Sequence, residues 1–181
     1  MLLDTPICDF GWKAPEFTLL DAHGQSHTMS HYLGERGLLI AFICNHCPFV
    51  KTVADRLAED TKSLQQAGVK VLAVMSNDYH DVAEDSPDKM VEFADTHGFE
   101  FPYLVDETQE VGKAYNAVCT PDFFGFNARG ELQYRGRLDD AKMRDATNRT
   151  PELLNAMLQI AETGLGPAEQ VASMGCSIKW S

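Results

Sequence analysis

The chain has 181 residues, of which 44% are hydrophobic, and this size and composition fit one compact domain with an apolar core but not two full domains. Its formal net charge is -12 at pH 7 and no Lys/Arg-rich run offsets it, which argues against nucleic acid as a partner. The N-terminus has neither the basic region nor the apolar stretch of a signal peptide, and no apolar run approaches the roughly 20 residues of a membrane span, so we expect a cytoplasmic protein that does not bind membranes.

The N-terminal part of the chain predicts a short strand, a turn and a second short strand. Phe17-Thr18-Leu19 has strand-forming residue types, and the turn-forming residues Asp21-Ala22-His23-Gly24 follow it. The next feature is a continuous apolar run over residues 38–43, bounded by Gly37. An unbroken apolar run of this length is typical of a central strand that helices cover on both faces.

A long amphipathic helix is predicted after that strand. From Pro48 onward, apolar residues recur at helical spacing over about twenty residues, and Gly68 ends the pattern. Residues 69–75 then form the next apolar strand. Because a helix separates the two strands, we expect them to be parallel and joined by a right-handed crossover. The sequence therefore predicts an α/β fold.

The second half of the chain alternates further helices and strands. Two charged segments in it are expected to be exposed to solvent: the acidic run 81–88, and a segment that contains Asp139, Asp140, Lys142 and Arg144. The predicted elements are a helix from Ser86-Pro87 to Gly98, a strand at 103–105, a short helix around 111–115, a hairpin of 122–126 and 132–135, and a last helix from Thr150-Pro151 to Gly164.

Two cysteines lie between the apolar strand and the long helix, in the segment Cys44-Asn45-His46-Cys47-Pro48. At a helix N-terminus, the helix dipole and unpaired backbone N–H groups stabilise a thiolate and lower the pKa of a cysteine. The five cysteines of the chain are an odd number and are otherwise scattered, unlike the disulfide framework of a small secreted protein. Cys44 and Cys47 therefore predict a thiol-dependent oxidoreductase.

With these features the chain resembles the thioredoxin superfamily, and within it the redoxin (AhpC/TSA, peroxiredoxin-like) branch. The resemblance is carried by Ala14-Pro15-Glu16-Phe17-Thr18-Leu19, by the segment 44–48, and by Thr120-Pro121 before a hairpin. It implies a thioredoxin fold, with a central mixed β-sheet flanked by helices and an N-terminal β-hairpin extension. We expect one domain over residues 1–166 and a mobile C-terminal tail over residues 167–181.

The resemblance also implies that Pro121 follows a cis peptide bond and lies beside the dithiol, where the backbone of Thr120 can pair with an extended substrate segment. Cys44 precedes the helix and is expected to be the more exposed thiol. In the expected reaction Cys44 attacks a substrate disulfide, and Cys47 resolves the mixed disulfide. This is the chemistry of a thiol-disulfide oxidoreductase.

The residues around the dithiol are expected to support it. Pro48 starts the helix, Asn45 is a candidate helix N-cap, and a protonated His46 can stabilise a thiolate, although a solvated helix-start residue is the simpler interpretation of this histidine. Two positions depart from thioredoxin: Leu38 stands in place of a buried acid, and Ile43 in place of a tryptophan. Proton transfer then needs another group or water, and docking to the usual thioredoxin partners is not expected.

A peroxiredoxin-like thiol peroxidase that reduces hydroperoxides is the alternative, because Cys47-Pro48 also matches the Cys-Pro of a peroxiredoxin. In that alignment Cys44 replaces the hydroxyl residue expected three positions earlier, and Ile40 replaces a proline. Either thiol could still be oxidised by peroxide to a sulfenic acid that the other resolves. The candidates for the arginine that helps to hold peroxide are Arg129, Arg135 and Arg137.

No metal or organic cofactor is expected. His23, His27 and His31 have no matching cysteine pair at zinc-ligand spacing. A minor alternative is a Cu(I)-binding protein of the same fold, because two thiols and a histidine suit that ion. The expected partners are protein or small-molecule disulfides, or hydroperoxides, together with a thiol reductant.

Three further cysteines have open roles. Cys119 directly precedes Thr120-Pro121 and is either an auxiliary thiol or a buried packing residue. Cys176 lies in the predicted tail, where it either folds back as a resolving thiol or only ends an ordered arm. A packing role is expected for Cys8.

Overall fold

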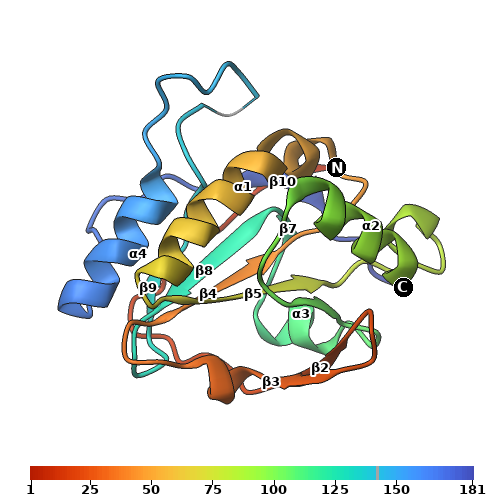
Figure 1. The fold of residues 1–181 in the computed structure, drawn as a ribbon, viewed down its shortest axis with the longest axis horizontal. Helices are drawn as coiled ribbons and strands as arrows, with labels where there is room; N and C mark the ends of the chain where they lie inside the picture. The colour runs from red at the N-terminus through yellow and green to blue at the C-terminus, as the bar shows by residue number, and fades with distance from the viewer. Residues whose placement is uncertain (142) are drawn as a thin grey trace.

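A mixed sheet of seven strands organises the fold in the computed structural model, which describes residues 1–141 and 143–181 (Figure 1). Its strand order is β3-β2-β6-β5-β4-β8-β9. The central strands β4, β5 and β6 are parallel, whereas β8 is antiparallel to β4. The strands are β2 (Thr18–Asp21), β3 (Ser26–Thr28), β4 (Leu38–Phe42), β5 (Lys70–Met75), β6 (Tyr103–Val105), β8 (Asp122–Phe126) and β9 (Leu132–Tyr134).

Helices cover both faces of this sheet (Figure 1). Side chains alternate along β4, so that Leu39 and Ala41 pack with α1, α2 and α4, and Ile40 and Phe42 pack on the α3 side with Tyr115. Within the described residues, no helix is both long and apolar enough to cross a membrane. The helices are α1 (Pro48–Gln66), α2 (Pro87–His97), α3 (Glu110–Ala114) and α4 (Glu152–Thr163), with short 3-10 helices η1 (Met29–Tyr32) and η2 (Ala83–Asp85).

The α/β architecture predicted from the sequence is confirmed. The apolar run 38–43 gives the central strand β4, in which every residue is buried. The N-terminal extension is the antiparallel hairpin of β2 and β3, and the second predicted hairpin is that of β8 and β9. Helix α2 begins at Pro87 and ends before Gly98, which adopts the left-handed conformation with φ 74°.

The charged segment near residue 140 differs from expectation at Asp139. This carboxylate is buried and accepts hydrogen bonds from Arg56 Nε at 2.8 Å and from Arg149 Nη1 at 3.4 Å. The expectation of an exposed segment is therefore wrong at this residue, because a buried carboxylate paired with guanidinium groups is stable without water. Lys142, which belongs to the same prediction, lies outside the described residues.

The C-terminal segment is packed into the fold in place of the mobile tail that we expected. Strand β10 (Met174–Ser177) pairs antiparallel with β1 (Leu2–Asp4) on one side and with β7 (Cys119–Thr120) on the other, which makes a separate three-stranded sheet. Beyond β10, Ile178 is buried in the core on the α3 side, and Lys113 lies over the ring of Trp180. These contacts tie the end of the chain to the domain.

If the end of the chain is part of the domain, Ile178→Ala should lower the free energy of unfolding by about 2 to 4 kcal/mol, as truncation of a buried isoleucine does. The matched control is Leu165→Ala, at a residue that is 61% exposed, and its expected effect is within about 0.5 kcal/mol. Urea unfolding followed by circular dichroism measures both. Equal, small effects of the two substitutions would mean that the terminal segment does not contribute to the core.

Candidate active site

The dithiol lies in the turn between β4 and α1. Both sulfurs are inaccessible to solvent, since Cys44 and Cys47 are each 0% exposed. The expectation that Cys44 is the more exposed thiol is therefore wrong. Cys47 is the residue before the first turn of α1, and Pro48 occupies that first turn, as expected.

Asn45 is not the helix N-cap. It is buried, its Nδ2 donates to the backbone oxygen of Glu84 at 3.0 Å, and its Oδ1 accepts a hydrogen bond from Tyr103 Oη at 2.8 Å. Its side chain thus joins the dithiol turn to η2 and β6. The N-cap position falls to Cys47, whose sulfur therefore lies at the N-terminus of α1.

The peptide bond between Thr120 and Pro121 is cis, as the resemblance implied, and it lies against both sulfurs. Cys44 Sγ and Thr120 Oγ1 are 3.3 Å apart. In its thiol form Cys47 donates to the backbone oxygen of Thr120, also at 3.3 Å. The expected supporting residues Thr120 and Pro121 are therefore in the site.

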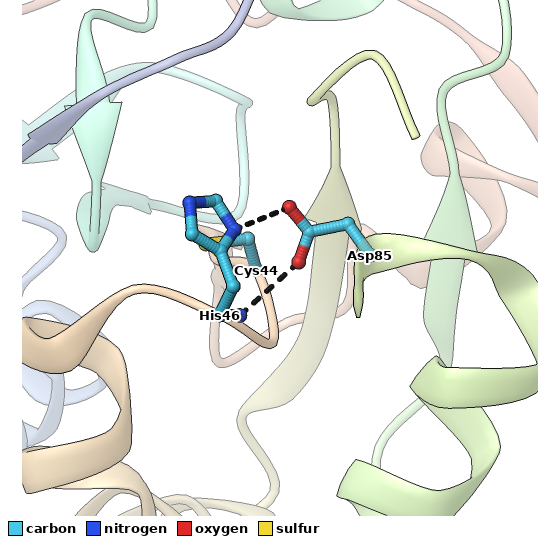
Figure 2. Close-up of side chains that lie close together, drawn as sticks. All are labelled: Cys44, His46 and Asp85. Carbon is cyan, nitrogen blue, oxygen red and sulfur yellow. Dashed lines mark hydrogen bonds and ion pairs between the residues drawn. The ribbon is translucent and has the colours of Figure 1, made fainter. Parts of the chain in front are cut away.

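A buried carboxylate, Asp85, holds the dithiol turn in place (Figure 2). Its Oδ1 accepts hydrogen bonds from the backbone N–H groups of Asn45 at 2.8 Å and His46 at 3.2 Å. Its Oδ2 accepts from His46 Nδ1 at 2.6 Å and from Asn77 Nδ2 at 2.9 Å. The acidic run 81–88 is therefore not a fully solvated loop, because Asp85 finds four donors inside the protein.

Sequence reasoning missed Asp85 as a functional residue. The absence of an acid at Leu38 indicated only that proton transfer needs another group or water. Several acidic residues occur between 81 and 88, and nothing in their spacing singles out Asp85. Only the packing of η2 against the dithiol turn does so.

The Asp85–His46 pair shifts the pKa of both groups. The hydrogen bond and charge of Asp85 raise the pKa of His46 above its ordinary value, more than partial burial lowers it, and the charge of Cys47 acts in the same direction. Burial alone would raise the pKa of Asp85, but hydrogen bonds from His46, Asn77 and the Asn45 backbone outweigh it, so that this pKa is lowered. A carboxylate and an imidazolium therefore coexist beside the thiols.

The two thiols have opposite pKa shifts. The pKa of Cys47 is lowered, first by a hydrogen bond from the Cys44 thiol and then by hydrogen bonds from Cys176 and from the backbone N–H of Val50 in the first turn of α1. The pKa of Cys44 is raised, because its proton is held by Cys47, because it is buried, and because the Asp85 carboxylate lies near. The arrangement thus favours a thiolate at Cys47 beside a neutral thiol at Cys44.

The remaining cysteines separate into one that contacts the dithiol and two that do not. Cys176, in β10, is partly exposed and packs against the core cluster that contains Cys47; burial and the neighbouring Cys47 raise its pKa to about 11. Cys119 is fully buried, which raises its pKa to about 12, and its sulfur faces the backbone oxygen of Pro121 at 3.8 Å. This burial suits a packing role for Cys119. Cys8 hydrogen-bonds Gln170.

The arginines considered for a peroxidase site are paired with acids. Arg129 Nε lies 3.1 Å from Glu131, and Arg137 Nε lies 2.6 Å from Glu152. Arg135 is buried, and its Nη2 donates a hydrogen bond to Asp122 Oδ2 at 2.9 Å. Each guanidinium is thus directed to a carboxylate.

Among the described residues, Cys44, His46 and Asp85 form a group whose potential metal-ligand atoms lie within 4.8 Å of one another. Both oxygens of Asp85 already accept two hydrogen bonds each, one of them from the His46 ring. The group contributes one thiol, whereas Cu(I) favours several soft sulfur ligands. The arrangement fits a hydrogen-bonded charge pair better than a copper site.

We expect Asp85→Asn to lower the pKa of His46, because the substitution removes the charge that raises it. The histidine ring resonances in an NMR titration measure this shift. Loss of hydrogen bonds to a buried carboxylate should also lower the free energy of unfolding by about 2 kcal/mol or more. The matched control is Asp55→Asn, which removes an exposed carboxylate from a different histidine, His97. An unchanged His46 pKa would contradict the role given to Asp85.

The same pair predicts a pH dependence of stability. The ionised Asp85 stabilises the fold above its ordinary pKa of 3.8, and this contribution is lost as pH falls through its lowered folded-state value. The protonated His46 stabilises the fold below its ordinary pKa of 6.5, and this contribution is lost as pH rises through its raised folded-state value. The stability difference between the wild type and Asp85→Asn, measured by urea unfolding, should therefore be greatest between about pH 4 and 6.5. A difference that is constant with pH would contradict this assignment.

Comparison with known proteins shows the family to which this chain belongs. The AhpC/TSA family model matches residues 10–135. The thiol-disulfide oxidoreductase ResA of Geobacillus kaustophilus is 32% identical over 124 residues, which cover 68% of this chain and 66% of that protein. A putative peroxiredoxin of Mycobacterium tuberculosis is 28% identical over 123 residues, covering 68% and 73%. The crystal structure of an uncharacterized conserved protein from Geobacillus kaustophilus superimposes with a TM-score of 0.93 at 39% identity, over 100% of this chain and 97% of that one. The family match spans more than half of the sequence, and the chain is therefore a member of the AhpC/TSA family, in the redoxin branch of the thioredoxin superfamily.

Proposed function

We propose that this protein is a thiol-disulfide oxidoreductase in which Cys44 and Cys47 cycle between dithiol and disulfide. The observation that carries the proposal is the position of the two thiols, at the N-terminus of α1 and against the cis peptide bond between Thr120 and Pro121. Cys47 receives hydrogen bonds from Cys44 and from the N-terminus of α1, and its pKa is lowered, while the pKa of Cys44 is raised. One thiolate beside one neutral thiol is the state required for attack followed by resolution.

The electrostatics favour Cys47 as the attacking thiolate, which reverses the order expected from the sequence. Cys47 attacks one sulfur of a substrate disulfide and displaces the other as a thiolate. Cys44 then gives up its proton, attacks Cys47 and releases the second substrate thiol, which leaves a Cys44–Cys47 disulfide. The imidazolium of His46 adds positive charge beside the reacting sulfurs.

A cavity of about 280 Å³ beside the cis-proline offers room for a substrate group. Phe49 and Val53 of α1 line it on one side, and Pro121 on another. The ResA relative bears the name of a thiol-disulfide oxidoreductase, which agrees with this assignment. The substrate would be a protein or small-molecule disulfide, with a thiol reductant that regenerates the dithiol in a reducing compartment such as the cytoplasm.

Hydroperoxide reduction is the second candidate function. A low-pKa thiolate followed by proline, at Cys47-Pro48, is the group that such chemistry needs, and a relative is named a putative peroxiredoxin. The pairing of Arg129, Arg135 and Arg137 with carboxylates favours disulfide exchange over this alternative.

Stopped-flow reaction of the reduced protein with glutathione disulfide, beside its reaction with hydrogen peroxide, tests these assignments. Cys47→Ser should slow disulfide exchange by about a hundredfold or more, since the ionised thiol is lost. Cys44→Ser should still react with glutathione disulfide through Cys47, but it should not form the Cys44–Cys47 disulfide that mass spectrometry detects in the oxidised wild type. Cys8→Ser, away from the dithiol, is the control.

Three outcomes would overturn parts of this proposal. Rapid exchange that survives Cys47→Ser but is lost with Cys44→Ser would restore the order of attack expected from the sequence. Rapid peroxide reaction with slow exchange, lost with Cys47→Ser, would make hydroperoxide reduction the main activity. Slow reaction with both oxidants would exclude both functions.

A further inference from the structure

Strand β10 occupies the edge at which the fold would receive a substrate strand. Cys176 is paired with Thr120, and Ser177 with Cys119, in the antiparallel ladder between β10 and β7. Thr120 directly precedes the cis peptide bond to Pro121 and contacts both sulfurs of the dithiol. The chain thus places its own C-terminal segment where an extended substrate would pair with the backbone of Thr120.

The register of β10 brings a third thiol to the dithiol. Cys176 is opposite Thr120, and the backbone oxygen of Thr120 is 3.3 Å from Cys47 Sγ. Cys176 also packs against the core cluster that contains Cys44 and Cys47, and it lies near enough to Cys47 to lower the pKa of that thiol. Of these three sulfurs, only that of Cys176 belongs to a residue with exposed surface.

Several contacts hold β10 in this register. Ser173 Oγ donates to the backbone oxygen of Pro121 at 2.7 Å, and the Ser177 N–H donates to the backbone oxygen of Met1 at 2.7 Å. Gly175 packs so closely on β7 that a Cβ atom there would lie 1.9 Å from the backbone oxygen of Thr120. This close approach needs a residue without a side chain.

We infer that β10 is an internal substrate strand and that Cys176 is a third redox thiol, which forms a disulfide with Cys47 of the same chain. The inference rests on the proposed function, because it uses the same Cys47 thiolate. It extends that function to residues beyond 135, where the match to the family model ends.

The chemistry with glutathione disulfide as the oxidant balances in two steps. The Cys47 thiolate attacks glutathione disulfide, forms a Cys47–glutathione bond and releases one glutathione thiolate, which takes the proton of Cys176. The Cys176 thiolate then attacks the Cys47 sulfur and releases the second glutathione. Two protein thiols are oxidised to one disulfide, and glutathione disulfide is reduced to two glutathione molecules. In the wild type, Cys44 then attacks Cys47, passes its proton to Cys176, and leaves the Cys44–Cys47 disulfide with a free Cys176 thiol.

Removing Cys44 should trap the inferred disulfide. We expect the full-length Cys44→Ser protein, oxidised with glutathione disulfide and digested without reduction, to yield a Cys47–Cys176 linked peptide by mass spectrometry. In Cys44→Ser/Cys176→Ser, the Cys47–glutathione adduct should persist at least about tenfold longer, because the intramolecular thiol is gone. The matched control is Cys44→Ser/Cys8→Ser, since Cys8 is also partly exposed with a pKa raised to about 11.

The outcomes separate this inference from the proposed function. A stable Cys47–glutathione adduct with free Cys176 in Cys44→Ser, while the wild type still forms the Cys44–Cys47 disulfide, overturns the inference and leaves the function intact. A Cys47–Cys176 bond found only between two copies, seen as a dimer on non-reducing gels, also overturns it. Failure of the wild type to oxidise at all overturns both.

A substitution that keeps every cysteine gives a second test of whether β10 lies against Thr120 and covers Cys47. Gly175→Ala should push β10 away from Thr120, so that the Cys47–Cys176 disulfide decreases in the Cys44→Ser background and alkylation of Cys47 by iodoacetamide becomes faster in the otherwise wild-type protein. The control is Gly34→Ala, because a Cβ atom at Gly34 meets only the Lys70 side chain at 3.8 Å. Equal alkylation rates in Gly175→Ala and Gly34→Ala would show that β10 does not cover Cys47.

Discussion

The geometry of the dithiol depends on one buried carboxylate. Asp85 accepts two backbone hydrogen bonds from the turn that carries the cysteines, one from the His46 ring and one from Asn77 at the end of β5. A buried charge is tolerated when donors surround it, and the same donors are then fixed in place. The turn between β4 and α1 is thereby tied to the sheet and to η2, rather than held by the helix start alone.

The groups around the dithiol shift the pKa values of its two cysteines in opposite directions. The Asp85 carboxylate disfavours an anion at Cys44, while the N-terminus of α1 and the hydrogen bonds of neighbouring thiols favour an anion at Cys47. The imidazolium of His46 hydrogen-bonds Asp85, and its positive charge offsets the negative charge of that carboxylate. Two chemically identical side chains, three residues apart, therefore acquire opposite pKa shifts from their surroundings.

The two ends of the chain lie together in a small sheet beside this site. β1 and β10 form a small sheet with β7 (Figure 1), and Met1 lies beside the end of β10, where its backbone oxygen accepts a hydrogen bond from the N–H of Ser177. The segment from residue 174 to the C-terminus covers the cis-proline edge and then continues to the α3 side, where Ser181 hydrogen-bonds Gln109. Cys44 and Cys47 are both buried, and Cys176 of β10 packs against the core cluster that contains them.

The sequence alone determined the architecture and identified the candidate dithiol. An unbroken apolar run, a helical apolar stripe and two hairpin signals specify the central sheet and its helices, because these patterns act over a few residues. Cys44, His46 and Cys47 were likewise found from a local motif, whereas the cis peptide bond before Pro121 was implied by the resemblance to the thioredoxin superfamily. The tertiary structure decided the role of Asp85, the burial of Asp139 and the place of Cys176, because each depends on partners distant in the chain. Hydrogen bonds that join residue 85 to residue 46, or strand pairing that joins residue 176 to residue 120, leave no periodic signal in the sequence.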